Sequence, residues 1–310
     1  MNKKILSNFA LFLTALIWGV SFVAQKAGMD YVGAFSFNFA RSILGGFSLI
    51  PLIFLVKMTT PDNRPKKLKH LQHWYLFKAG AFCGLALFTA MSLQQYSMIS
   101  ASAGKAGFIS ALYIIFVPLI SMFFGAKLEN KIKVSVGLAL VGLYLLCFKG
   151  GLTGFDMYDG LLLIGAFFYG VHILVVNHFS RHVNPVKMSC VQFFVVGLLS
   201  LPFMLMFENP VAANFVAAKT PILYAGILTC GVAYTLQIFG QKFTPPTIAS
   251  IILCMESVFA VVGGSLILHE TMTPREAWGC IFMIIAVVLS QIQMKNFKKG
   301  LTVCSQNNDE

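Results

Sequence analysis

The chain has 310 residues, of which 57% are hydrophobic and only 11% are charged, whereas an ordinary soluble domain has about 25% charged residues. With 30 Phe, 14 Met and a mean hydropathy of +0.79, this composition excludes a disordered chain, a secreted disulfide scaffold and a soluble enzyme of usual make-up. The formal net charge of +12 would suggest nucleic acid as the partner of a soluble protein, but here the basic residues follow membrane topology, so no nucleic-acid partner is expected.

Apolar runs between polar breaks predict an all-α polytopic membrane protein with ten transmembrane helices. Each run is close to the roughly 20 residues that cross the hydrocarbon core of a bilayer. Lys3 and Lys4 precede the first run as in a signal peptide, but that run is longer than an h-region and no small-x-small site follows, so we expect an uncleaved first helix. In chain order, the predicted spans are 8–26, 33–56, 74–96, 102–124, 132–148, 157–177, 186–207, 220–241, 246–268 and 276–293.

Basic residues are concentrated on one side of the predicted bundle. With the N-terminus in the cytoplasm, 17 of the 23 Lys and Arg fall on the cytoplasmic side, four fall on the outer side, and Arg41 and Lys105 lie within spans. The positive-inside rule therefore predicts that both termini are cytoplasmic, in a multi-pass protein of a bacterial inner (plasma) membrane. The longest loop, 58–73, carries four of the basic residues, and we expect it to lie near anionic lipid headgroups.

The two halves of the sequence match each other weakly but in the same order. The offset between matching residues is 151 before the basic loop and 143 after it, and the matches extend over five successive spans, which predicts a duplication. The matches are 15–21 with 166–172, Gly46 with Gly197, Pro51 with Pro202, 90–94 with 233–237, Ala106 with Ala249, Phe116 with Phe259 and, at an offset of 142, Gly137 with Gly279.

An odd number of spans in each half forces the second half to enter the membrane from the opposite face. The predicted units are a first five-helix repeat at 8–148, a second, inverted five-helix repeat at 157–293, and a cytoplasmic tail at 294–310. Inverted repeats allow a bundle to rock between outward-open and inward-open states around a midplane site. A duplicated membrane scaffold that transports nothing is the alternative.

Several short motifs resemble the EamA branch of the drug/metabolite transporter superfamily. They are Trp18-Gly-Val-Ser-Phe22, Phe39-Ala-Arg41, Gly104-Lys-Ala-Gly-Phe-Ile109 with Leu112, Tyr113 and Pro118, and Leu266-Ile-Leu-His-Glu270. The resemblance covers roughly residues 8–293 and implies a ten-helix inverted-repeat carrier, usually an exporter of amino acids, related metabolites or toxic compounds. The family often has proline after the glutamate of the ninth span. Here Ser257 follows Glu256, so the resemblance does not imply a helix kink at this point.

Charged residues inside spans are the first candidates for function, because one at a helix centre costs at least about 2.5–3.5 kcal/mol. Glu256 is predicted near the midplane, on a face with Ala249, Ala260 and Gly263 that suits the bundle interior. It could carry a coupling proton, balance a substrate charge, or donate one structural hydrogen bond as a neutral acid.

Two cations complete this set of intramembrane charges. Arg41 is predicted at nearly the depth of Glu256, on a face of small and polar residues. It could bind an anionic group of a substrate, or pair structurally with carbonyl oxygens or with Glu256. Lys105 is close to the outer end of the fourth span, so its stem could reach the outer surface, and a role at the outer mouth is the functional alternative.

Polar and aromatic residues of several spans are candidates for a substrate path. In the first span, Trp18, Ser21 and Gln25 follow Thr14 at helical spacing, a polar stripe that lipid would not tolerate cheaply. Ordinary helix packing is the alternative for the aromatic residues, and a hydrogen-bonded core histidine is the alternative for His172. The candidates in later spans are Gln94, Tyr169, His172, Tyr234 and Gln237.

Signals of an enzyme, a metal or a cofactor are poor. The chain has no Walker A motif, no Gly-x-Gly-x-x-Gly and no His-Glu-x-x-His, and its seven cysteines lack CxxC spacing. We therefore expect no cofactor, no metal site and no enzyme. Together with the inverted repeat, the resemblance to the EamA branch implies a secondary carrier that exports small amino-acid-like or amphiphilic metabolites by alternating access. The alternatives are an intramembrane enzyme acting on a lipid or isoprenoid substrate, whose carboxylates or histidines would cluster at one membrane face, and a sensor that transports nothing.

Overall fold

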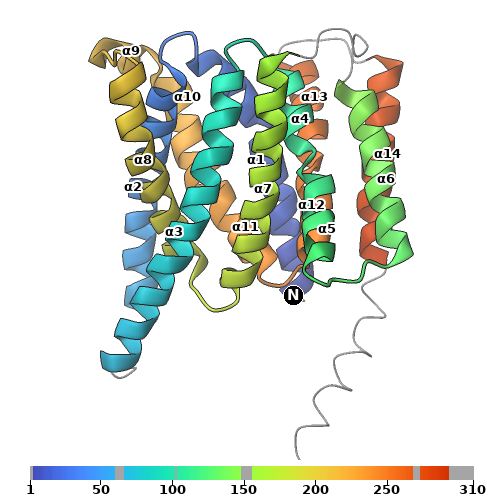
Figure 1. Cartoon of the computed structure of the whole chain (residues 1–310), viewed down its shortest axis with the longest axis horizontal. Helices are drawn as coiled ribbons and strands as arrows, with labels where there is room; N and C mark the ends of the chain where they lie inside the picture. Colours follow the sequence, from blue (N-terminus) through green and yellow to red (C-terminus); the bar gives the residue numbers. More distant parts are fainter. Residues whose placement is uncertain (1–2, 60–65, 102, 148–155, 268–272, 293–310) are drawn as a thin grey trace, which may run out of the picture.

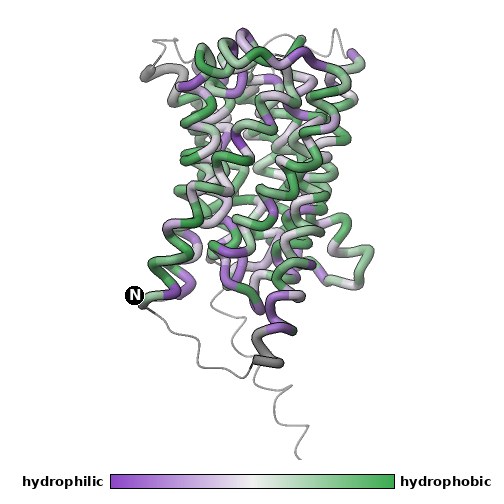
Figure 2. Tube along the Cα trace, turned by 90° about the vertical axis from the view of Figure 1, so that its left-hand side faces the viewer, coloured by the Kyte–Doolittle hydropathy of each residue, from purple (hydrophilic) through white to green (hydrophobic). Residues whose placement is uncertain are grey.

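The computed structural model describes residues 3–59, 66–101, 103–147, 156–267 and 273–292, and these residues form a bundle of helices without strands (Figure 1). The tail predicted at 294–310 lies outside the described residues. Figure 2 shows apolar residues along the length of the bundle and hydrophilic residues gathered mainly at its two ends. A lipid-facing belt between polar ends is the distribution expected of a membrane protein.

The helices of the first half follow the first five predicted spans. They are α1 (Lys3–Gly28), α2 (Ala34–Thr59), α3 (Lys66–Ser97), α4 (Ala103–Ala111), α5 (Tyr113–Phe123) and α6 (Asn130–Cys147). The described residues of the second half form nine elements of different lengths. They are α7 (Met157–Ser180), α8 (Pro185–Phe207), α9 (Ala212–Ala217), α10 (Lys219–Leu223), the π-helix η1 (Tyr224–Ala233), α11 (Tyr234–Gln241), α12 (Pro246–Leu253), α13 (Met255–Ile267) and α14 (Pro274–Ile292).

Within the described residues, seven helical stretches are long and apolar enough to cross a membrane, which makes the chain a multi-pass membrane protein. They coincide with the first four and the sixth to eighth predicted spans. The other three predicted spans are also helical, as α6, as α12 with α13, and as α14. The seven stretches are 3–28, 34–58, 70–97, 103–123, 157–180, 185–207 and 219–241.

Three predicted spans are helical but are not regular α-helices throughout. The span at 102–124 is interrupted at Leu112, the span at 246–268 at Cys254, and the span at 220–241 is a π-helix over 224–233. At both interruptions the hydrogen bonds tighten to three-residue spacing: Ile115 N–H donates to Leu112 O at 2.9 Å, and Ser257 N–H donates to Cys254 O at 3.1 Å. The helix is therefore interrupted beside Glu256 although no proline follows it.

The helices pack in pairs that link the two halves. α2 packs along α8, and α6 packs along α14 at one side of the bundle (Figure 1). α1 packs on α13, while α7 packs on α4 and α5; likewise α3 packs on α7 and α8, while η1 packs on α1 and α2. These contacts correspond between the halves. The contact of α1 with α13 corresponds to that of α7 with α4 and α5, and the contacts of α3 with α7 and α8 correspond to those of η1 with α1 and α2.

Close contacts between α2 and α8 also recur at matching positions. A Cβ atom on Gly46 would lie 3.1 Å from the Phe194 ring, and one on Gly197 would lie 2.6 Å from the Ile43 side chain. Gly46 and Gly197 are 151 residues apart, as are Ile43 and Phe194. The two contacts therefore join corresponding residues, with the first and second halves exchanged.

A second reciprocal pair of contacts joins the first helix of each half to a broken helix of the other half. A Cβ atom on Gly19 of α1 would lie 2.7 Å from the Cβ of Phe259, and one on Gly170 of α7 would lie 3.1 Å from the Cβ of Phe116. Gly19 and Gly170 are 151 residues apart, and Phe116 and Phe259 are 143 apart. Glycine is needed here because the two backbones approach too closely for a side chain.

Candidate functional site

The two interrupted helices meet in the interior of the bundle. Cys254, at the interruption between α12 and α13, donates from its thiol to the backbone oxygen of Ala111 at 3.3 Å, where α4 ends. Tyr113, the first residue of α5, donates from its hydroxyl to Glu256 Oε1 at 3.0 Å. The two interruptions thus lie next to each other, and beside them two polar side chains from different halves are in contact inside the bundle.

Glu256 lies in the first turn of α13, not in the middle of a continuous helix. The residues predicted to share its face, from Ala249 to Gly263, are thus distributed over α12 and α13, on either side of Cys254. Glu256 is buried, with 4% of its surface exposed. The N-terminal end of a helix favours negative charge, so this position stabilises a carboxylate better than a mid-helix position would.

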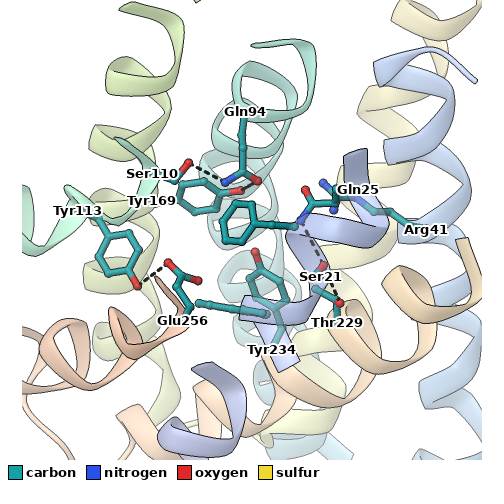
Figure 3. A pocket seen from close by; sticks show the side chains of 12 residues that line it. Ser21, Gln25, Arg41, Gln94, Ser110, Tyr113, Tyr169, Thr229, Tyr234 and Glu256 are labelled. Carbon is teal, nitrogen blue, oxygen red and sulfur yellow. Dashed lines mark hydrogen bonds between the residues drawn. The ribbon is translucent and has the colours of Figure 1, made fainter. Parts of the chain in front are cut away.

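A narrow cavity opens beside Glu256 (Figure 3). It leaves about 30 Å³ open to the centres of water-sized molecules, which is enough for one or two waters. Residues from both halves line it: Trp18, Ser21, Phe22, Gln25, Arg41, Gln94, Ser110, Tyr113, Tyr169, Thr229, Tyr234 and Glu256.

Arg41 of α2 is buried, with 2% of its surface exposed. Its Nε donates to Asn38 Oδ1 at 2.9 Å, and Asn38 Nδ2 in turn donates to the backbone oxygen of Met91 at 3.2 Å. The guanidinium carbon lies 5.3 Å from the centre of the Phe37 ring. Among the described residues, no carboxylate lies within 4.0 Å of this cation, so its charge is held by an amide and an aromatic ring.

The two charged groups lie on opposite sides of the cavity. Figure 3 shows Arg41 at one side and Glu256 at the other, with Tyr169 and Tyr234 between them. The direct Arg41–Glu256 pairing considered as one alternative is therefore absent from the described residues. A cation and an acid that face a common space without neutralising each other can bind a molecule that carries both charges.

Aromatic rings line the space between the charges. The rings of Trp18 and Tyr234 are tilted against each other with centroids 4.7 Å apart. Tyr234 also contacts Phe193 and His172, with centroids at 5.1 and 5.9 Å. This packing holds Trp18 and Tyr234 in place and leaves them able to cover an apolar group.

Two short hydrogen-bond chains complete the lining. Tyr169 Oη donates to Gln94 Oε1 at 2.9 Å, and Gln94 Nε2 donates to Ser110 Oγ at 2.8 Å. On the other side, Ser21 Oγ accepts from Gln25 Nε2 at 3.2 Å and from Thr229 Oγ1 at 3.0 Å. Thr229 lies in η1, where the wider π-helical turn alters the direction of the side chains, an arrangement often found at functional sites.

Some buried polar atoms of the lining have no hydrogen-bond partner among the described residues. They are Trp18 Nε1, Arg41 Nη2 and Gln25 Oε1. Leaving a buried donor or acceptor unpaired costs about 1–3 kcal/mol each. Two donors and one acceptor around one cavity therefore favour binding of a polar molecule there.

Eight of the eleven residues singled out from the sequence line this cavity, and His172, Gln237 and Lys105 do not. His172 Nε2 lies 3.3 Å from Gln192 Oε1 in the core. Gln237 is fully buried, and neither of its polar side-chain atoms has a partner among the described residues. Lys105 lies 2.6 Å from the carboxylate of Asp159 on α7, so it joins the two halves instead of only reaching to the surface.

Four lining residues were not among the candidates: Phe22, Ser110, Tyr113 and Thr229. Tyr113 had a signal that was not used, because the offset of 143 pairs it with Glu256. Ser110 and Thr229 had none, since serine and threonine are common in membrane helices and often bond only to their own backbone. Asp159, which pairs with Lys105, was also missed.

The described residues contain no group of three or more His, Cys, Asp or Glu side chains that could hold a metal ion. The cysteines at positions 83, 190, 230, 254 and 280 are free thiols. The chemistry of the cavity is therefore that of hydrogen bonds, two charges and aromatic faces.

The model of the EamA-like transporter family matches residues 5–148 and again residues 157–291. An uncharacterized transporter of Archaeoglobus fulgidus is 30% identical over 293 residues, covering 94% of this chain and 88% of the relative. The uncharacterized transporter YoaV of Bacillus subtilis is 23% identical, covering 89% and 93%. A probable terminal-alkyne amino-acid exporter of Streptantibioticus cattleyicolor is 21% identical, covering 73% of each chain.

A crystal structure of a protein has the same fold, with a TM-score of 0.72 and 16% identity over 94% of this chain and 98% of the other. The family and the names of the relatives point to transporters rather than enzymes. The resemblance to the EamA branch is thus confirmed across nearly the whole chain: this protein belongs to the EamA-like transporter family and is a membrane transporter.

Proposed function

We propose that the protein is a secondary carrier that exports small amino-acid-like or amphiphilic metabolites through the central cavity. The observation that carries this proposal is the opposed placement of Arg41 and Glu256 around aromatic rings. A zwitterionic amino acid fits this arrangement, with its carboxylate at Arg41, its ammonium group at Glu256 and its side chain against Trp18 and Tyr234. The relative named as a probable amino-acid exporter supports the same substrate class.

We propose a bundle of ten spans in two inverted five-helix repeats, 8–148 and 157–293. The two matches to the family model support this division. The reciprocal contacts of Gly46 with Phe194 and of Gly197 with Ile43 also support it, because a two-fold relation between the halves requires such pairs. The helix interruptions, at Leu112 and Cys254, are 142 residues apart, which is within one residue of the offset of 143 between these spans.

Transport would proceed by alternating access. About 30 Å³ of open space is far too small for an amino acid, so the halves must move apart for a substrate to enter. Inverted repeats supply two equivalent ways of opening, one toward each side of the membrane. The Lys105–Asp159 ion pair joins α4 of one half to α7 of the other and would have to open in one of these states.

We propose that the protein lies in an inner (plasma) membrane and that both termini are in the cytoplasm. The 17 to 4 distribution of basic residues supports it. So does the arrangement in which α1 begins and α14 ends at the same end of the bundle (Figure 1), as an even number of crossings requires. Energy would come from a counter-substrate or from a proton bound at Glu256.

Counterflow in proteoliposomes tests the proposal. Purified protein is reconstituted in vesicles loaded with one unlabelled amino acid at a time, and uptake of the same labelled compound is measured. We expect counterflow with a subset of amino acids that have apolar or aromatic side chains, and its loss in an Arg41→Gln, Glu256→Gln double variant. Absence of flux with any amino acid or amphiphilic amine would reject this substrate class and favour a membrane scaffold that transports nothing.

A further inference from the structure

A second hollow lies away from the central cavity. The turn from α7 to α8, which forms part of it, is at the end of the bundle where α1 begins, as the ribbon in Figure 1 shows. The start of α3, the turn from α7 to α8 and the turn from α11 to α12 form its walls. It leaves about 310 Å³ open to the centres of water-sized molecules, enough for a phosphate group together with bound water. It differs from the central cavity in size, in position and in the residues that form it.

Two of the three walls of this hollow are basic. Arg181 and Lys187 come from the turn between α7 and α8 and the start of α8, and Lys242 comes from the turn after α11; His73 and His182 line the same space. Among the residues that the structure describes, no acidic side chain lines it. Cations that converge on a concave surface without a carboxylate to neutralise them create a strong local attraction for anions.

The local backbone adds to this attraction. The 23-residue helix α8 begins at Pro185 in the wall of the hollow, and the Asn184 side-chain oxygen accepts from the backbone N–H of Lys187 at 3.2 Å. The positive end of the helix dipole therefore faces the hollow. Two lysines, one arginine and a helix N-terminus together suit an anion with several oxygen atoms, such as a phosphate group.

The surface next to the hollow is suited to lipid. Trp74 and Phe77 of α3 are 55% and 52% exposed and stack with centroids 6.0 Å apart. Lys78 Nζ lies 5.3 Å from the centre of the Trp74 ring. Exposed aromatic and basic residues side by side are typical of the membrane–water interface, so acyl chains can lie beside α3 while a headgroup enters the hollow.

We propose that this hollow is a binding site for the phosphate group of an anionic phospholipid. The assignment of that lipid to the cytoplasmic leaflet rests on the proposed orientation, whereas the site itself depends on neither the transported substrate nor the central cavity. A basic pocket between membrane helices at this level is the arrangement that holds anionic headgroups in place.

The test measures binding of phosphatidylglycerol and of phosphatidylcholine to the delipidated full-length protein by native mass spectrometry. The pocket variant is Lys187→Gln with Lys242→Gln. The control is Lys131→Gln with Lys133→Gln, two exposed lysines at the start of α6, at the same end of the bundle and with the same change in charge. A third variant, Lys187→Arg with Lys242→Arg, keeps the charge. The melting temperature of each variant in phosphatidylcholine, compared with that of the wild-type protein, checks that the variants fold.

We expect phosphatidylglycerol to bind the wild-type protein more tightly than phosphatidylcholine, and the pocket variant to weaken this binding by about tenfold or more. The control and the arginine variant should change it by less than about twofold. Equal weakening in the pocket and control variants would mean general attraction to a basic surface and would overturn the site.

A parallel titration with inorganic phosphate distinguishes a lipid headgroup from a soluble phosphate compound as the source of the phosphate group. If phosphate stabilises the wild-type protein but not the pocket variant, while the two lipids bind alike, the ligand is a soluble phosphate compound and the lipid assignment is wrong.

Discussion

Tyr113 and Glu256 occupy the same position in the two halves of the chain, 143 residues apart, and are joined by a hydrogen bond of 3.0 Å. Tyr113 is the first residue after the interruption at Leu112, and Glu256 is the second residue after the interruption at Cys254. One position of the repeat thus carries a phenol in the first half and a carboxyl group in the second. The pair couples the two halves at the point where they meet beside the cavity, and it makes the site asymmetric.

A Tyr113→Phe variant tests this coupling. The substitution keeps the ring but removes the donor to Glu256, and a hydrogen bond to a charged group contributes about 1.5–3 kcal/mol. We expect the protein to fold and its counterflow rate to fall by about tenfold or more. The matched control is Tyr31→Phe, because Tyr31 is 48% exposed outside the cavity. If both variants transport like the wild type, the bond has no part in the cycle.

Glu256→Gln tests the coupling proton. Glutamine keeps the size and polarity of the side chain but loses its charge and cannot exchange a proton. We therefore expect counterflow to persist at a higher half-saturating substrate concentration, while accumulation driven by a pH gradient is lost. Vesicles with and without an imposed pH gradient measure the two activities separately. Unchanged rates at every pH would instead mean that Glu256 neither binds the substrate through its charge nor carries a proton, and only makes a structural hydrogen bond.

The same residue allows a test of the structural alternative. Since Arg41 and Glu256 do not form an ion pair, adding Arg41→Gln to Glu256→Gln should make the loss of function worse. Rescue of a misfolded Glu256→Gln protein by Arg41→Gln would point to a buried ion pair and contradict the separation of the two groups.

Arg41→Lys tests recognition of a carboxylate. Lysine keeps the charge but lacks the planar fork of donors and the stacking on Phe37. We expect the substrate concentration for half-maximal counterflow to rise by about tenfold. This corresponds to a loss of about 1.4 kcal/mol of binding free energy. Amine analogues that lack the carboxylate should bind the wild-type and variant proteins equally. A variant that loses the carboxylate and amine substrates to the same extent would assign Arg41 a structural role.

Cysteine labelling tests the position of α1. Ser21 and Gln25 line the cavity and are buried, whereas Leu16 and Val23 lie on the outer surface, 39% and 37% exposed. In membranes, cysteines at Ser21 and Gln25 should react with water-soluble reagents while the carrier cycles, and substrate should protect them. Cysteines at Leu16 and Val23 should face lipid and resist. Equal labelling at all four positions would contradict this orientation of the helix.

Gly19→Ala tests the close approach of α1 and α13. A Cβ atom at Gly19 would lie 2.6 Å from the backbone oxygen of Glu256, which cannot move aside as a flexible side chain can. We expect the variant to lose about 1–3 kcal/mol of stability, measured as a lower melting temperature in detergent. Gly137→Ala is the control, because no atom lies within 4 Å of its Cβ position. Equal melting of both variants would mean that the two helices can separate without cost.

The sequence alone determined the class of protein and much of its interior. Composition and the length of the apolar runs lead to a helical membrane protein, and the motifs from Trp18 to Pro118 lead to the family that the comparison confirms. Trp18, Ser21 and Gln25 could be assigned to the cavity side of α1 because helical spacing decides which residues share a face. Polar residues on such a face must avoid lipid, and that rule holds whatever the neighbouring helices are.

Only the tertiary structure decided which side chains meet. The interruption at Cys254 divides the face on which Glu256 was predicted to lie, and no proline marks it in the sequence. Lys105 has no acidic partner on its own helix, and its bond to Asp159 depends on how α4 packs against α7. The separation of Arg41 from Glu256 is of the same kind. Helical periodicity determines the directions of side chains within one helix. Distances between helices are set by the packing of residues that lie more than a hundred positions apart, and no local sequence pattern contains that information.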